Sequence, residues 1–444
     1  MAINLLETKV ERPPEIDQKE KTARLEEELR RIVEAKEIDP IKLERDLQEA
    51  TEILQNEKEK IRPRDTEGRG GGLIELKKDI PTLVLHDIHG QREYLLKAML
   101  EKDESGRSNL EKMMRGELQV VCLGDALHTE LGGARERWLG IQKEARNNFE
   151  FSPYMDAEMA DSFGAANMIM KLKIASPEHF HYLRGNHDDI EELRLSKFHI
   201  PLNRPVRQYL AAKYPPDFIK RYHAFEENLP YAAVGKGFVL SHAEPMEEYT
   251  RNQIINIKKH PHLAQNFIWT RDWQAATAEI ETGDDATKKT LRNLLPQKDA
   301  EKAVWLGGHT PTANPKIDFE TGTSGRFIRF YNPGKMNVAL VQPETPFSPE
   351  KDIHDVSRIE IEREAIPESS TIEGKGQPQT ETRDFKEGHE VNVLVTKPDG
   401  TKELQPGWKI VGRHPESKQL VVQYPPTKYF RFVTEEELAK WNKK

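Results

Sequence analysis

The chain of 444 residues is long enough for one large catalytic domain with smaller additions. Hydrophobic residues make up 36% and charged residues 32%, so the chain can build a core while much of it must be solvated. The formal net charge of -8 argues against broad binding to a nucleic-acid backbone.

The single cysteine, Cys122, excludes an intramolecular disulfide and a thiolate metal site. Any bound metal must therefore be held by His, Asp, Glu or Asn. The first residues, MAINLLETKVERPPEIDQ, lack the apolar run of a signal peptide. No stretch approaches the roughly 20 apolar residues that span a membrane. We expect a cytoplasmic protein with neither a membrane nor a nucleic-acid partner.

Residues 1–72 are predicted to form a helical extension. Asp39-Pro40 offers a helix cap followed by a proline at the first helical position. A narrow apolar stripe at helical spacing includes Leu25, Leu29, Ile32, Leu43, Leu47, Ala50 and Leu54. Such a stripe indicates either a helical hairpin or coiled coil that self-associates, or a solvated extension with no partner.

Residues 73–364 are predicted to form an α+β or α/β layered domain. Short apolar runs alternate with helical stretches such as 155–173, a pattern typical of buried strands between helices. The expected strands are 82–85, 120–123, 181–183, 238–240, 304–306 and 338–340. The carboxyl ends of such strands are where α/β sheets place ligands.

Residues 365–385 are polar and contain Gly and Pro without an apolar period, which predicts a flexible linker. Residues 386–444 are predicted to form a small β-barrel-like (SH3-like) module. Its expected strands are 391–395, 408–411, 420–422 and 429–433, followed by a short helix at 435–441. Pro398-Asp399-Gly400 is a hairpin turn signal. This module is a candidate site for a protein partner.

Five short motifs stand at the ends of predicted strands, and each follows an apolar run. They are Asp87-Ile88-His89-Gly90, Gly124-Asp125, Gly185-Asn186-His187-Asp188, Ser241-His242-Ala243-Glu244 and Gly307-Gly308-His309-Thr310. Glycine at these positions allows tight turns and leaves room for ions and substrate. Each motif alone is a weak signal, but all five in order predict a shared metal site.

The predicted ligands are Asp87, His89, Asp125, Asn186, His242 and His309. Imidazole, carboxylate and amide ligands without thiolate suit two divalent ions, with Mn favoured over Fe or Zn. A carboxylate can bridge two ions, and Asp125 is the natural candidate. Two ions about 3.5–4 Å apart can share an activated water for an in-line phosphoryl displacement.

The order of these motifs resembles that of the calcineurin-like metallophosphoesterases, over roughly residues 82–341. Residues 87–91 (DIHGQ) and 183–188 (LRGNHD) are similar to the phosphoprotein phosphatase branch and its bacterial relatives. The resemblance implies a metallophosphoesterase β-sandwich flanked by helices. It also implies a dinuclear metal-dependent phosphatase that uses a metal-bridging hydroxide as nucleophile on a phosphorylated substrate.

The resemblance also assigns roles to individual residues. Asp87 and His89 would bind the first ion, Asp125 would bridge, and Asn186, His242 and His309 would complete the second. His187 would protonate the leaving oxygen or stabilise the developing charge. Arg184 would bind phosphate through its two-pronged guanidinium. Arg271 is either a second phosphate clamp or the partner of Asp272 in a surface salt bridge.

The sequence departs from the family after Asp125. The usual Gly-Asp-x-Val-Asp-Arg-Gly is replaced by residues 124–130, GDALHTE, so the Asp that orients the acid histidine is absent. His128 or Glu130 is a candidate replacement. His86 also stands where the family has glycine.

These departures leave the substrate class open. A phosphomonoesterase that resembles the serine/threonine protein phosphatases is favoured. The alternatives are a dinucleoside polyphosphate hydrolase and a scaffolding or regulatory protein with a degenerate site. No predicted ligand lies before residue 73 or after residue 364, so both ends are expected to be dispensable for chemistry.

Overall fold

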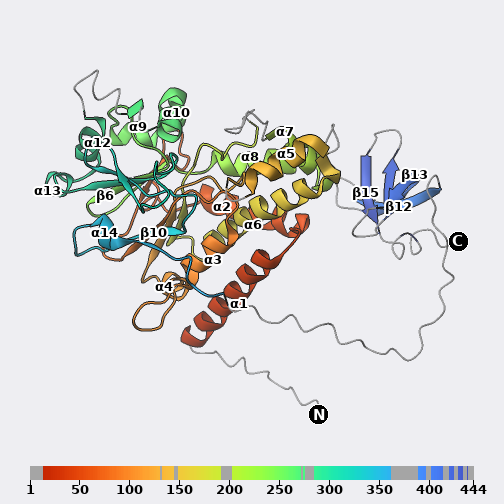
Figure 1. Cartoon of the computed structure of the whole chain (residues 1–444), viewed down its shortest axis with the longest axis horizontal. Helices are drawn as coiled ribbons and strands as arrows, with labels where there is room; N and C mark the ends of the chain where they lie inside the picture. Colours follow the sequence, from red (N-terminus) through yellow and green to blue (C-terminus); the bar gives the residue numbers. More distant parts are fainter. Residues whose placement is uncertain are drawn as a thin grey trace, which may run out of the picture. The chain divides into compact units, whose positions relative to one another are not determined.

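The computed structural model describes residues 14–130, 133–144, 149–191, 203–271, 274–275, 285–361, 389–396, 402–413, 420–424, 429–433 and 438. The chain divides into two compact units, residues 1–208 with 215–361 and residues 209–214 with 362–444. All six predicted metal ligands belong to the first unit. Figure 1 shows the strands and helices of both units.

The longer helices are α1 (Pro14–Glu34), α2 (Pro40–Gln55), α3 (Arg92–Leu100), α5 (Ala134–Glu144), α6 (Pro153–Ala175), α7 (Asn203–Lys213), α8 (Phe218–Glu227), α10 (Pro261–Trp269) and α12 (Ala286–Leu294). Shorter helical segments are α4 (Asn109–Met114), η1 (Phe149–Phe151), α9 (Arg251–Ile255), η2 (Ile257–Lys259), α13 (Gln297–Ala300) and α14 (Pro349–Asp352). The expected helix at 155–173 is confirmed as α6.

The strands of the first unit form two mixed sheets. One has the order β1 (Leu73–Glu75), β5 (Ala232–Val234), β6 (Phe238–Ser241), β7 (Val304–Gly307), β9 (Phe327–Arg329) and β8 (Glu320–Thr321). The other has the order β11 (Ile353–Asp355), β10 (Asn337–Val341), β2 (Thr82–Leu85), β3 (Gln119–Cys122) and β4 (Phe180–Tyr182). All six strands predicted for this domain are present, within one or two residues of the expected bounds.

The two sheets bury a common apolar core, which confirms the layered α/β sandwich. Val84 and Val121 of one sheet belong to the same buried cluster as Leu240 and Leu306 of the other. β2, β3 and β4 are parallel, and so are β6 and β7. Their carboxyl ends therefore open at common edges, which is the arrangement that gathers the five motifs.

The N-terminal helices pack against the first unit's own helices. α2 contacts α6 and α8, and α1 contacts α3, α4 and α6. The predicted Asp39 cap is confirmed, because its side chain accepts the backbone N–H groups of Ile41 and Lys42. Leu43 and Leu47 are fully buried. The apolar stripe that suggested self-association is thus covered within this chain.

This packing changes the expectation for a chain that starts near residue 73. Residues 14–72 belong to the same compact unit as the strands, and Ile61 lies in the core between the sheets. Asn167 on α6 donates to the buried Asp46 on α2 at 2.9 Å. Contrary to the expectation of dispensability, we expect that removing residues 1–72 destabilises the unit, because these contacts would be lost.

A buried ion network joins the segment after α2 to helix α6. Glu57 accepts from Arg62 at 3.0 Å and from Lys173 of α6 at 2.5 Å, and the three side chains are almost fully buried. Burial alone would raise the pKa of Glu57, but Lys173 and Arg62 outweigh burial and lower it. The carboxylate thus compensates two buried cations.

Replacing Glu57 with glutamine is expected to destabilise the protein by about 3–5 kcal/mol, because it leaves Lys173 and Arg62 buried without a counter-charge. Urea unfolding at neutral pH measures the change. Glu59→Gln, at an exposed position two residues further, is the matched control and should stay within about 0.5 kcal/mol of the wild type. Equal stabilities of the two variants would contradict this account of the network.

The second unit contains a four-stranded antiparallel sheet. Its order is β12 (Glu390–Thr396), β13 (Lys402–Arg413), β14 (Leu420–Tyr424) and β15 (Tyr429–Val433). The four predicted strands are confirmed. Within the described residues the sheet is an open meander, so barrel closure stays a prediction. The predicted linker, the turn at 398–400 and most of the helix at 435–441 lie outside the described residues.

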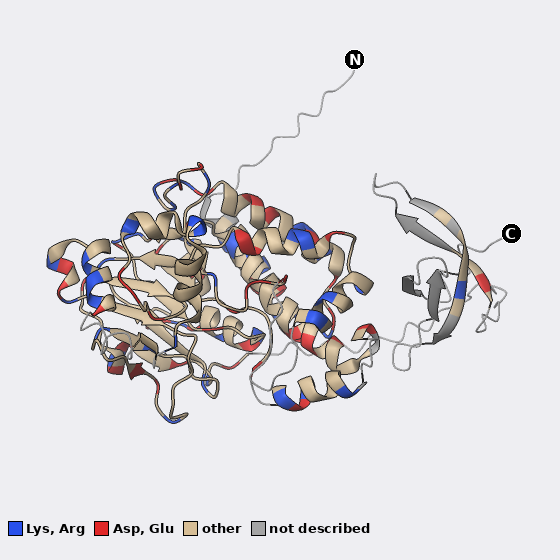
Figure 2. Ribbon diagram, turned by 90° about the horizontal axis from the view of Figure 1, so that it is seen from above, with Lys and Arg blue, Asp and Glu red and all other residues tan. Residues whose placement is uncertain are grey.

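Acidic and basic side chains are interspersed along the helices of the first unit, as Figure 2 shows. The described helices include none with the length and apolar character needed to cross a bilayer.

Candidate metal centre

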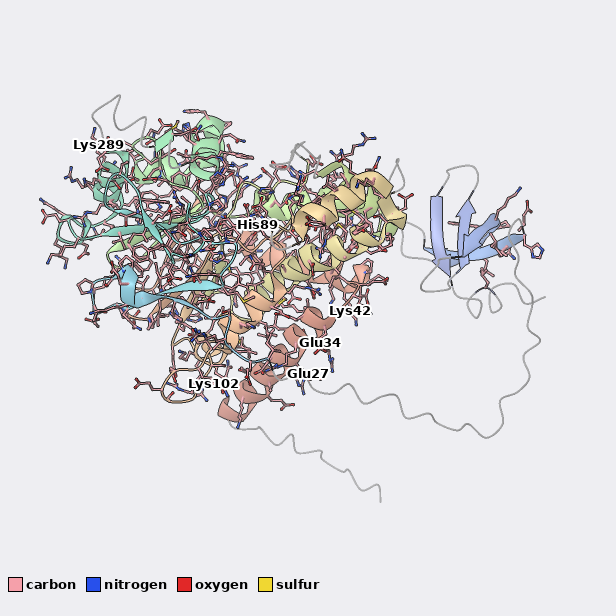
Figure 3. All side chains as sticks on the ribbon, in the orientation of Figure 1. Glu27, Glu34, Lys42, His89, Lys102 and Lys289 are labelled. Atoms are coloured by element: carbon pink, nitrogen blue, oxygen red, sulfur yellow. The ribbon has the colours of Figure 1, made fainter. Side chains whose placement is uncertain are left out.

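The five motifs occupy loops directly after five strands. Asp87 and His89 follow β2, Asp125 follows β3, Asn186 follows β4, His242 follows β6 and His309 follows β7. The structure brings all six side chains together in the interior, and each is at most 7% exposed. His89, labelled in Figure 3, lies inside the unit between the strands and the helical layer.

Asp125 lies at the middle of the cluster. Its Oδ2 is 3.5 Å from His89 Nε2 and 3.4 Å from His242 Nε2. It belongs to two potential metal-binding groups, one with His89 and His187 and one with Asp87 and His242. A carboxylate shared by two such groups is placed as a bridging ligand would be.

Two imidazoles are oriented by backbone carbonyl groups. His89 Nδ1 lies 2.8 Å from the carbonyl oxygen of His128, and His242 Nδ1 lies 3.0 Å from that of Leu123. A carbonyl can only accept, so Nδ1 carries the proton in both rings. The Nε2 lone pairs then face the Asp125 carboxylate, and this carbonyl-bonded tautomer is the one that metal-ligating histidines use.

The side-chain oxygen of Asn186 lies close to the cluster-facing nitrogens of two histidines, His242 and His309. This Oδ1 atom is 2.8 Å from His242 Nε2 and 2.8 Å from His309 Nδ1. His309 Nε2 is 3.2 Å from the carbonyl oxygen of Trp269, which leaves Nδ1 toward the cluster. Burial lowers the pKa of His309, and His242 and Arg271 lower it further, so this ring is neutral.

The loops hold the ligands in an uncommon backbone conformation. His89, Asp125 and His309 have φ angles of 44°, 56° and 60°, in the left-handed region that non-glycine residues rarely adopt. Such strain persists where the surroundings fix it and is concentrated at functional sites. A Cβ at Gly185 would collide with Asp125, and one at Gly308 would collide with Asp87. Glycine is therefore needed for the loops to approach each other.

The residues present fit divalent cations. Asp87 is fully buried, and its Oδ1 has no hydrogen-bond donor among the described residues. Burial raises the pKa of Asp87, and the neighbouring Asp125 carboxylate raises it further. The two buried carboxylates and the imidazole lone pairs that face Asp125 form a set of acceptors, and a cation among them would stabilise the charged forms of the carboxylates.

Asp188 is a functional residue to which the sequence assigned no role. Its Oδ2 accepts the backbone N–H groups of Asp125 at 2.9 Å and Gly185 at 2.7 Å. Its Oδ1 accepts the hydroxyl of Tyr182 at 2.7 Å. The side chain thus joins the Asp125 loop to the Asn186 loop. The sequence feature that could have indicated its role is its position as the last residue of the Gly-Asn-His-Asp motif.

His187 lies beside the centre and is held from two sides. Its backbone N–H donates to Asp125 Oδ1 at 2.7 Å, and its Nδ1 is 3.0 Å from Nδ1 of His128. His128, one of the two candidate replacements for the missing orienting Asp, therefore lies in hydrogen-bond range of His187. The Glu130 carboxylate instead receives the hydroxyl of Tyr331 at 3.4 Å.

Arg184 is buried and paired with carboxylates. Its guanidinium donates to Glu227 at 2.7 Å and to Asp189 at 3.2 Å, and it lies 5.8 Å from the ring centre of Tyr231. Burial lowers the pKa of Arg184, but Tyr231 and Glu227 outweigh burial and raise it. The side chain is thus permanently charged, and its role in binding phosphate stays a prediction.

Arg271 is exposed and follows α10, the helix whose last residue, Trp269, contacts His309. Its charge contributes to lowering the pKa of His309, so it lies on the side of the centre formed by that residue. The alternative partner, Asp272, lies outside the described residues. The proposed clamp therefore also stays a prediction.

The geometry gathers candidate metal ligands of three kinds, carboxylate, imidazole and amide, at the carboxyl ends of strands from two packed sheets. A model of the calcineurin-like phosphoesterase family matches residues 80–313, just over half of the chain, and the protein belongs to that family. The matched range contains all six predicted ligand residues. The protein is thus a metal-dependent phosphoesterase of a family that uses divalent ions.

Comparison with curated proteins finds no match. Among solved structures, the chain is similar to a cold-active protein tyrosine phosphatase, with 13% identity, a TM-score of 0.32, and 66% of this chain and 78% of that chain covered. A second similar structure is the cold-active protein-tyrosine phosphatase of a psychrophilic Shewanella species. It has 12% identity and a TM-score of 0.32, and the match covers 66% of this chain and 79% of that chain.

Proposed function

We propose that the protein is a phosphomonoesterase with a dinuclear metal centre, preferring Mn²⁺. The observation that carries the proposal is the position of Asp125, whose Oδ2 lies within 3.5 Å of both His89 Nε2 and His242 Nε2. Bound ions would supply Lewis-acid activation of water and neutralise charge on the phosphoryl group. Asp87 and His89 would hold one ion, and Asn186, His242 and His309 the other.

His187 acts as the general acid in this proposal. Its backbone bond to Asp125 fixes the imidazole at the edge of the centre, and the contact with His128 fixes the ring rotation. Because the Nδ1 atoms of His187 and His128 face each other, Nε2 of His187 remains available to donate a proton to the leaving oxygen. His128 is neutral when it accepts from His187, so it gives less charge stabilisation than a carboxylate would.

Arg271 would assist in binding the phosphate. The Arg271 guanidinium is exposed on the His309 side of the centre. It can therefore pair with two phosphate oxygens without first giving up a bond to a buried partner. Arg184 would have to exchange its bonds with Glu227 and Asp189, which favours Arg271 as the first contact. These observations support a site that offers a bound phosphate few fixed hydrogen-bond donors and that accepts a broad range of small phosphomonoesters.

We expect the Mn²⁺-loaded full chain to hydrolyse several small phosphomonoesters, with weaker selectivity for phosphopeptides. A panel of monoesters, a diester, a dinucleoside tetraphosphate and phosphopeptides, compared by kcat/KM, tests this. Arg271→Ala should raise KM for the monoesters, while Arg115→Ala, on the surface after α4, should not change it. A preference for the dinucleoside tetraphosphate by orders of magnitude would overturn the proposal, as would inactivity on every ester.

A further inference from the structure

A second group of potential ligands lies outside the metal centre, at α8. The ligand atoms of Asp189, His223 and Glu226 all lie within 4.8 Å of one another. His223 and Glu226 are three residues apart on one helix, so their side chains share a face. Asp189 comes from the loop after β4. None of the three has a part in the proposed chemistry.

The spacing of these atoms suits an ion better than direct bonds. His223 Nδ1 is 3.8 Å from Asp189 Oδ1 and 4.0 Å from Glu226 Oε2, which is too far for hydrogen bonds. Two ligand atoms that each bind one ion at about 2.0–2.2 Å can lie up to about 4 Å apart. A single cation could therefore contact all three with small side-chain adjustments.

Two polar atoms of this group have no hydrogen-bond partner among the described residues. Glu226 is 1% exposed, and its Oε1 is unpartnered while Oε2 accepts the backbone N–H of Ile190 at 2.8 Å. His223 Nδ1 is likewise buried and unpartnered. Burying a carboxylate oxygen and an imidazole nitrogen without partners is costly, and a shared cation would satisfy both.

The surroundings favour a cation as well. Burial raises the pKa of Glu226, and the carboxylates of Asp188 and Asp189 raise it further, although Arg184 opposes them. Arg184 bonds to the other oxygen of Asp189, Oδ2, at 3.2 Å, so Oδ1 faces His223. On the opposite side of the imidazole, Nε2 lies 3.9 Å from Glu191 Oε2.

We propose that Asp189, His223 and Glu226 form an additional divalent-cation site, separate from the Asp125 centre. One imidazole and two carboxylates suit Zn²⁺ or a similar transition-metal ion. His223 would bind through Nδ1, with its Nε2 edge turned toward Glu191. The ion would join the loop after β4 to α8 and stabilise the fold rather than take part in hydrolysis.

The test is to count Zn²⁺ ions per chain by elemental analysis after equilibrium dialysis of the full-length protein. His223→Ala and Glu226→Gln should each bind one ion fewer than the wild type. His262→Ala, an exposed histidine on α10, is the matched control and should bind the same number. Adding Asp125→Asn should lower the count further, because the two sites are separate. Zn²⁺ should also raise the melting temperature of the Asp125→Asn protein, and His223→Ala should reduce this shift.

Glu226→Gln preserves the side-chain shape and the acceptor for the Ile190 N–H, so it decides the outcome if His223→Ala does not fold. Melting curves of the metal-free proteins show which variants are folded. Equal Zn²⁺ counts in the wild type and Glu226→Gln would overturn the proposed site. That result would leave the Asp125 centre untouched, because the Asp125→Asn comparison measures the centre independently.

Discussion

Replacing Asp125 with asparagine is expected to remove bound metal and hydrolytic activity together. The carboxylate lies 3.5 Å from His89 Nε2 and 3.4 Å from His242 Nε2, so both halves of the centre depend on its charge. Asparagine keeps the shape but offers a neutral oxygen, which cannot offset two divalent charges. Elemental analysis and steady-state kinetics on a phosphomonoester measure the two losses.

The matched control is Asp79→Asn, an exposed aspartate before β2, which should keep its metal and its rate. A melting curve of the metal-free Asp125→Asn protein separates lost binding from lost folding. Full activity of Asp125→Asn, with unchanged metal content, would refute the assignment of this residue.

His187→Ala is expected to keep its metal and lose turnover. A general acid contributes typically about 10²–10⁴-fold, and alanine removes the only part of His187 that can donate to the leaving oxygen. The backbone N–H that bonds to Asp125 remains in the variant, so the loop geometry should persist. The loss should be smaller for a nitrophenyl ester, whose leaving group needs little protonation.

The variant His128→Asn tests the contact between His128 and His187 through a smaller expected loss of turnover. Its shorter amide cannot replace the 3.0 Å contact in the same position, so turnover should fall by less than in His187→Ala, with metal content unchanged. His262→Ala, far along α10 from the centre, should behave as the wild type. Equal losses on good and poor leaving groups would show that His187 is not the acid.

The fold and the gathering of the candidate ligands at one place were largely predictable because the relevant signals are local. Each predicted ligand follows a short apolar run, and four of the six (His89, Asp125, Asn186 and His309) have a glycine beside them; parallel strands then bring the side chains to a common edge. The strands β1, β5, β8, β9 and β11 were not predicted, because runs of two or three residues carry no period. Their pairing is set by neighbours that are distant in sequence.

Other features depend on contacts that a single sequence does not encode locally. The apolar stripe of α2 (Pro40–Gln55) was recognised, but its partners, α6 (Pro153–Ala175) and α8 (Phe218–Glu227), come much later in the sequence. Arg184 matches the phosphate-binding position, yet its partner Glu227 follows 43 residues later. His128 reaches His187 from a left-handed conformation with φ of 66°, which the residue type alone does not predict.

The most direct test of the metal centre is anomalous diffraction at the Mn edge from crystals grown with Mn²⁺. The account predicts two peaks about 3.5–4 Å apart, with Asp125 touching both. Asp87 and His89 should contact one peak, and Asn186, His242 and His309 the other. The absence of a peak among these six residues, with Mn²⁺ bound elsewhere or not at all, would contradict the central claim.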